Sequence, residues 1–168
     1  MYVVDLGKFI WGNNPHTWEQ EGLDWGLSQS FENVQYDRVI DSINTLLSDE
    51  FKIPVRYDQH VPPQSFLILP QSDELVEQLS GGQSREYNIL ISYQLKSGGR
   101  YGRHTFKQLS QKAEHVKRLI INNSAYTSSG SYKWHSGNIV SVEHERDEDD
   151  RSLLRALMTF NCVVTEVI

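Results

Sequence analysis

The stretch "LRALMTFNCVVTEVI", residues 154–168, decides the interpretation of the fold. Its side chains alternate in character, with Thr159, Asn161 and Thr165 on one face and apolar residues on the other. The apolar face consists of Met158, Phe160, Cys162, Val164 and Ile168. A period of two residues is that of a β-strand with one buried face. We therefore predict that this segment lies inside a sheet, where its apolar face is covered.

A second alternating segment, "REYNILISYQLKS" (residues 85–97), is the clearest strand in the chain. The side chains on its apolar face are Tyr87, Ile89, Ile91, Tyr93 and Leu95. Three further segments also read as strands. Residues 53–61 alternate as a half-buried strand, residues 65–70 ("SFLILP") form a short apolar run typical of a strand covered on both faces, and residues 133–146 form a strand bulged at Gly137.

Two segments show the three- and four-residue spacing of amphipathic helices, residues 33–51 and residues 106–123. The stripe of the first is Tyr36, Val39, Ile40, Ile43, Leu46 and Leu47, and that of the second is Phe106, Leu109, Ala113, Val116 and Ile120. Residues 124–132 are predicted to be a polar loop. Long strands with short connections indicate an α+β fold, a mostly antiparallel sheet with two helices packed on one face.

Residues 1–32 differ from the remainder, because they contain three of the four tryptophans but no continuous helical or strand pattern. Glycines and Pro15 interrupt any long helix there. We predict an extended N-terminal arm (1–32) attached to one α+β domain (33–168). The arm's tryptophans are expected to pack on their own domain or on a neighbour, and they are Trp11, Trp18 and Trp25. The segment has neither the pattern of a signal peptide nor an apolar run of membrane length.

The net charge of −6 is unevenly distributed. Residues 85–118 contain eight Lys or Arg against two Glu, a net +6, so the other residues carry −12. We expect Arg100 and Arg103, in a glycine-rich loop, to contact a neighbouring subunit or the channel, and the acidic segment is the oppositely charged surface that such a subunit offers. The residues proposed there are Glu145, Asp147, Glu148, Asp149 and Asp150. A nucleic-acid face and a simply solvated surface are the other interpretations of such patches.

Motifs for chemistry are missing from the sequence. Cys162 lies within an apolar strand pattern and is predicted to be a packed core thiol. The histidines lack compact metal spacing, and "SGGRYGRHTFK" lacks the order of a phosphate-binding loop. The histidines are His16, His60, His104, His115, His135 and His144. We expect no catalytic activity, no cofactor and no metal.

The order of elements, together with three segments, resembles the tail-terminator (tail-completion) proteins of long-tailed bacteriophages. The segments are "YNILISY", "KWHSGNIVSVE" and "ALMTFNCVV", and the resemblance covers about residues 33–168. It implies a structural virion protein that forms a ring, typically a hexamer, at the head-proximal end of the tail tube. Such a ring ends tube polymerisation and joins the tail to the head.

The resemblance also implies the partners and the location of the protein. The partners would be other copies of the chain, the tail tube protein, neck or connector proteins, and the genomic DNA that passes through the channel, with no membrane. The protein would be made in the host cytoplasm and located in the tail or neck of the virion. Residues 1–32 depart from the small members of the family. The alternatives are another head–tail connector or head-completion protein, a nucleic-acid-binding module that uses the basic segment, and an enzyme with an unfamiliar site.

Overall fold

The computed structural model describes residues 32–98 and 102–167, and it gives only the backbone of residues 102 and 103. Within these residues the chain forms one compact unit that begins at Val34. The arm predicted over residues 1–32 falls almost entirely outside the described residues and stays a prediction. The assignment of Ile168 to the apolar face of the last strand lies outside them as well.

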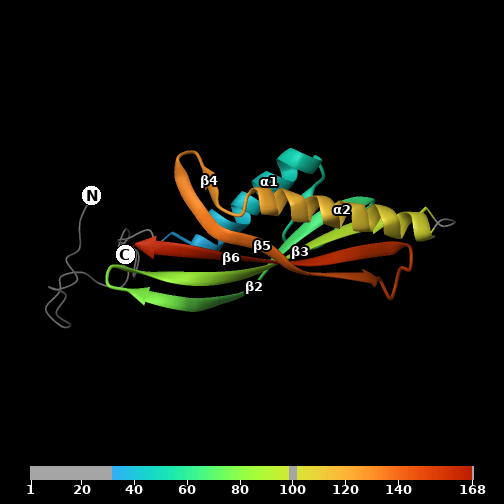
Figure 1. The fold of residues 1–168 in the computed structure, drawn as a ribbon. Helices are drawn as coiled ribbons and strands as arrows, with labels where there is room; N and C mark the ends of the chain where they lie inside the picture. Colours follow the sequence, from blue (N-terminus) through green and yellow to red (C-terminus); the bar gives the residue numbers. More distant parts are fainter. Residues whose placement is uncertain (1–31, 99–101, 168) are drawn as a thin grey trace, which may run out of the picture. The chain divides into compact units, whose positions relative to one another are not determined.

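In the described residues the strands form one six-stranded sheet of order β1-β2-β3-β6-β5-β4 (Figure 1). The strand bounds are β1 Val55–Arg56, β2 Gln64–Leu79, β3 Gly82–Lys96, β4 Tyr126–Ser128, β5 Ser131–Arg146 and β6 Leu153–Val167. Only β1 and β2 pair in parallel, and the other neighbours are antiparallel. The predicted α+β class with a mostly antiparallel sheet is confirmed.

The two stretches with the clearest alternation lie side by side as the central strands β3 and β6. Tyr87 pairs with Cys162, Ile89 with Phe160 and Ile91 with Met158. These side chains are all buried, as are the other members of the apolar face of β6 from residue 154 to 164. The prediction that residues 154–168 belong to the sheet core is confirmed for the described part, because β6 has β3 on one side and β5 on the other.

The helices cover one face of this sheet (Figure 1). A π-helical segment, Val34–Ile40, continues into α1, Asp41–Phe51. The left-handed conformation of Lys52 (φ 55°) ends α1, and its N–H donates to Ser48 O over 3.1 Å. The long helix α2 covers Gly102–Asn122. Both predicted apolar stripes point into the core, although Tyr36 in the first is exposed and Leu46 and Phe106 are only half-buried.

Two predicted strands have different bounds in the structure. The strand expected over residues 53–61 shrinks to Val55–Arg56, because prolines on both sides limit backbone pairing and residues 57–63 form a loop. The strand expected over residues 65–70 extends to Leu79, since its polar continuation pairs with β3 in a long hairpin. The run is also not covered on both faces: Phe66 and Ile68 are buried under the helices, whereas Leu67 and Leu69 are only half-buried.

The region before β5 contains a hairpin that was predicted as a loop. Residues 126–128 form β4, and a two-residue turn at Ser129 and Gly130 with φ of 54° and 72° joins it to β5. Two positive φ angles are those of the type I′ turn that matches strand twist. The bulge predicted at Gly137 is confirmed, because the register with β6 shifts between His135 and Asn138.

Candidate functional site

Potential metal ligands are dispersed over the described residues. Among residues 32–98 and 102–167 no group of three or more His, Cys, Asp or Glu could hold a metal ion. Cys162 is fully buried, as predicted, and burial raises the pKa of its thiol, with a smaller contribution from Glu86. No helix in the described part is long and apolar enough to cross a membrane.

The acidic segment forms the turn between β5 and β6, and much of its charge is already engaged (Figure 1). Arg155 on β6 lies 2.5 Å from Asp147 and 3.5 Å from Glu145. The other carboxylate oxygen of Asp147 accepts the backbone N–H groups of Asp150 and Asp149. These hydrogen bonds, first that from Asp150, hold the pKa of Asp147 below its usual value. Asp147 and Glu145 in this turn thus find their hydrogen-bond and ion-pair partners within the same chain.

Asp150 and its neighbours complete this local structure. Asp150 accepts hydrogen bonds from the hydroxyl and the N–H of Ser152, at 2.6 and 3.0 Å, and the hydroxyl bond is the main reason why the pKa of Asp150 is lowered. The side chains of Glu148 and Asp149 are exposed and have no ion pair in the described part of the chain. Of the five acidic residues proposed for an interface, only these two are left with free carboxylates.

The basic loop begins beside this acidic turn. Ser97, at the end of β3, donates its N–H to Ser152 O over 2.6 Å, so the two segments leave the same end of the sheet in one chain. Arg100 lies outside the described residues, and so does the side chain of Arg103 at the start of α2. Trp11, Trp18 and Trp25 lie outside them too. The proposed contact between these residues and another copy stays a prediction.

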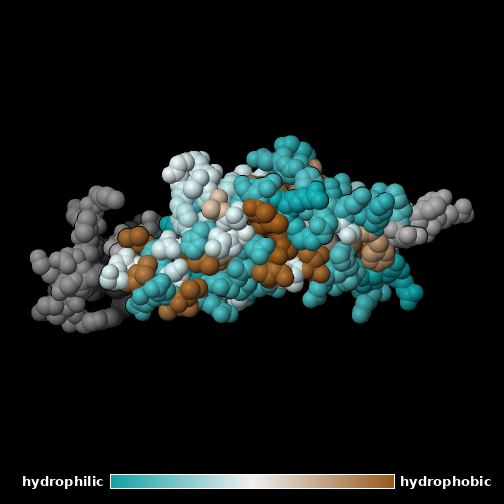
Figure 2. Space-filling model, in the orientation of Figure 1, coloured by the Kyte–Doolittle hydropathy of each residue, from teal (hydrophilic) through white to brown (hydrophobic). Residues whose placement is uncertain are grey.

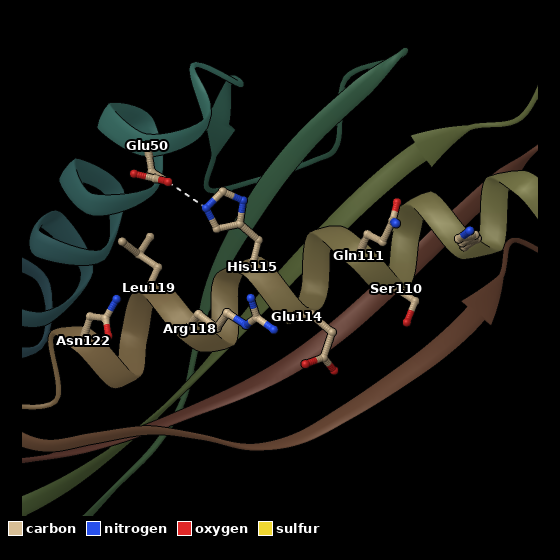
Figure 3. A pocket seen from close by; sticks show the side chains of 9 residues that line it. Glu50, Ser110, Gln111, Glu114, His115, Arg118, Leu119 and Asn122 are labelled. Carbon is tan, nitrogen blue, oxygen red and sulfur yellow. Dashed lines mark hydrogen bonds and ion pairs between the residues drawn. The ribbon is translucent and has the colours of Figure 1, made fainter.

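A groove of about 780 Å³ runs along the exposed side of α2 to the end of α1 (Figure 3). Its carboxylates are engaged: Glu50 lies 2.6 Å from Nε2 of His115, and Glu114 pairs with Lys117. Its two other cations, Lys107 and Arg118, have no ion pair among the described residues. The half-buried Leu119 adds an apolar surface to the groove. The groove therefore presents two cations that have no ion pair among the described residues.

A second depression, of about 450 Å³, lies on the sheet face that has no helices. The loop 57–63 brings His60 onto this face, with its ring nitrogens 2.9 Å from Ser65 Oγ and 2.8 Å from Ser92 Oγ. Burial, and secondly the charge of Arg155, lowers the pKa of His60 to about 4. Four leucines also line the depression, together with polar residues such as Gln94 and Arg155. The leucines are Leu67, Leu90, Leu153 and Leu157. The sequence gives no signal for the contact between His60 and Ser92, because the two residues are 32 positions apart.

The far end of the β2–β3 hairpin exposes apolar side chains (Figure 2). Leu75 and Val76 are 52% and 56% exposed, Leu79 is 40% exposed, and Val167 at the end of the neighbouring β6 is 90% exposed. β1 pairs only with Phe66 and Leu67, so within the described residues the edge of β2 beyond Leu67 has no partner strand. Sequence reasoning missed this surface because residues 71–79 are mostly polar and show no strand signal.

Three comparisons relate the chain to known proteins. No family model matches the chain, and no curated protein matches it. The structure has a likeness to a chain from a solved structure titled "Virion of native gene transfer agent (GTA) particle", with a TM-score of 0.49 and 13% sequence identity. The likeness covers 79% of this chain and 90% of that chain. A likeness at this level does not establish a shared function.

Proposed function

We propose that this protein is a structural component of a phage-like virion, and more specifically a tail terminator. In this role several copies form a ring, expected to be a hexamer, at the head-proximal end of the tail tube. The ring stops tube polymerisation and provides the surface to which the neck or connector proteins bind. Its partners are the tail tube protein, the neck proteins and the genomic DNA that passes through the channel.

One observation supports this proposal most directly. The segments "YNILISY" and "ALMTFNCVV", on which the resemblance to tail terminators rests, are the paired central strands β3 and β6. The third, "KWHSGNIVSVE", lies in β5 next to β6, with its glycine at the bulge. The resemblance therefore concerns the residues that build the sheet core rather than scattered surface positions. The helices precede β1 and follow β3 in the order that the resemblance requires.

The surfaces of the chain suit assembly better than chemistry. A groove with two unpaired cations lies along α2, and exposed apolar side chains lie at the hairpin end, so the two surfaces are on separate elements. Two different surfaces on one chain can join copies head to tail, and such a contact closes into a ring when the rotation allows it. The one cysteine is a core residue whose thiol pKa is raised, which does not suit a nucleophile.

The decisive experiment is electron microscopy of the purified full-length protein, together with its mass by sedimentation velocity. We expect rings with a central hole and a mass several times 19.4 kDa. A virus that lacks the protein should produce tail tubes of uncontrolled length that do not attach to heads. A protein that stays monomeric and binds DNA with a steep salt dependence would contradict the proposal and favour the nucleic-acid-binding alternative.

Rings that bind heads without limiting tube length would favour another head–tail connector instead. This outcome is separated from the first by adding the protein to tail tube protein during polymerisation. A tail terminator should bind the tube end and stop growth, whereas a connector that acts only on the head side should leave tube length unchanged.

A further inference from the structure

We propose that the end of the β2–β3 hairpin of one copy docks into the α2 groove of the next copy. The inference rests on the ring proposed above and assigns the two surfaces that close it. The hairpin supplies Glu74 and Glu77 with the apolar side chains around them. The groove supplies Lys107 and Arg118.

The hairpin end has the properties of an interface rather than of an ordinary solvated turn. Leu75 and Val76 are more than half exposed, and several hydrophobic side chains reach the surface between polar ones at this end (Figure 2). Leu79 and Val167 lie in register on either side of Gly82, which has no side chain to cover them. Within residues 32–98 and 102–167, these apolar side chains are left exposed.

The acidic residues of the hairpin fix the kind of contact. Asp73 is held by Arg85 at 2.5 Å, but Glu74 and Glu77 have no ion pair in the described part of the chain. Charged side chains on an open edge strand oppose the addition of another strand. The hairpin should therefore bind through its side chains, to a surface that offers cations beside an apolar patch.

The α2 groove is such a surface (Figure 3). Its own carboxylates, Glu50 and Glu114, contact His115 and Lys117 rather than Lys107 or Arg118. The half-buried Leu119 lies in the groove, and Ile121, three residues beyond Arg118 on the same helix, is 60% exposed. The combination of two free cations and apolar side chains matches the two free carboxylates and apolar side chains of the hairpin.

The acidic β5–β6 turn is the other negatively charged segment, and it fits the groove less well. Arg155 of the same chain already binds Glu145 and Asp147, and Asp150 is bonded to Ser152. Its free carboxylates, Glu148 and Asp149, have no exposed large apolar side chain beside them. The turn therefore lacks the apolar side chains that the hairpin end offers to the groove.

A charge-swap series tests the assignment. Glu74→Lys with Glu77→Lys should raise the protein concentration at half-assembly by about tenfold or more, and so should Lys107→Glu with Arg118→Glu, because each places like charges together. The variant with all four substitutions should recover assembly, since the charges match again. The control is Asp58→Lys with Glu143→Lys, which changes two exposed carboxylates that have no ion pair among the described residues and lie outside both surfaces, and it should assemble as the wild type does. Sedimentation velocity measures assembly, and circular dichroism verifies that each variant is folded.

The outcomes separate this inference from the proposed function. If the wild type forms rings and both charge-swapped pairs also assemble normally, the docking assignment is wrong while the ring function stands. The same conclusion follows if the folded four-substitution protein fails to recover, or if only the Asp58 and Glu143 control loses assembly. A wild type that never assembles overturns the ring function and the docking with it.

Discussion

The two faces of the sheet are built by different means, and β6 contributes to both. Its even-numbered side chains from Leu154 to Val164 are completely buried under the helices. Its odd-numbered neighbours, such as Arg155 and Leu157, lie half-buried on the face without helices. The covered face is held by apolar packing, whereas the other is held by polar contacts between distant residues. The difference teaches that one strand can have a structural face and a face available for partners.

The largest expected effect comes from the covered face. Phe160 is completely buried and its ring meets Trp134 edge-on, with centroids 5.4 Å apart. Phe160→Ala should lower the free energy of unfolding by about 3–5 kcal/mol, because it removes packing and leaves a cavity. The adjacent Thr159→Ala, on the other face, should cost about 1 kcal/mol or less. Urea denaturation of the two variants measures the difference, and equal losses would show that the two faces do not differ as described.

A smaller loss of folding stability should follow from adding a side chain at the β-bulge of β5. A Cβ added to Gly137 would lie 2.5 Å from Nε1 of Trp134, which is buried and donates a hydrogen bond to Asn123 O. The indole cannot move without losing that bond, so Gly137→Ala should cost about 1–3 kcal/mol. The control is Gly81→Ala, where a Cβ meets nothing within 4 Å. Thermal denaturation should show a clear drop for the first variant alone, and similar melting temperatures would contradict the tight packing at the bulge.

The covered face is also the part that the sequence predicts well. Strict alternation in β3 and β6 and the stripes of both helices identify nearly all of its side chains, because burial on one face imposes a period. The open face is not covered by helices, so it imposes no such period on the sequence. His60, Ser92 and Arg155 come from a loop and two strands, so no local spacing joins them. The length of β2 was missed for a related reason: residues 71–79 pair with β3 through the backbone, and a strand with little burial needs no apolar pattern.

The candidate surfaces were predicted least well, because charge in a sequence does not show which charges are free. Residues 143–150 are the densest acidic run, yet Arg155 binds two of its members across the β5–β6 turn, and the sequence alone does not show this pairing. The free carboxylates Glu74 and Glu77 lie in a less conspicuous segment. Only the three-dimensional pairing separates the two groups.

The smallest expected effect concerns the open face and is a change in how folding stability depends on pH. Burial lowers the pKa of His60 to about 4, from an ordinary value of 6.5. The unfolded chain therefore binds more protons than the folded one between these values, and stability falls as the pH falls through this window. The contribution of neutral His60 is fully present above pH 6.5 and is lost as the pH approaches 4.

The variant His60→Gln can still hydrogen-bond to Ser65 or Ser92 but does not titrate. Its urea midpoint should therefore decrease less than that of the wild type between pH 7.5 and pH 4.5. Asp147 and Asp150 also lose stabilising contacts on acidification, but their lowered pKa values place that loss below pH 3.8 and leave it unchanged in both proteins. Because His60 is only partly buried, the difference should be modest. Parallel pH profiles for the two proteins would mean that His60 is not held neutral on the open face.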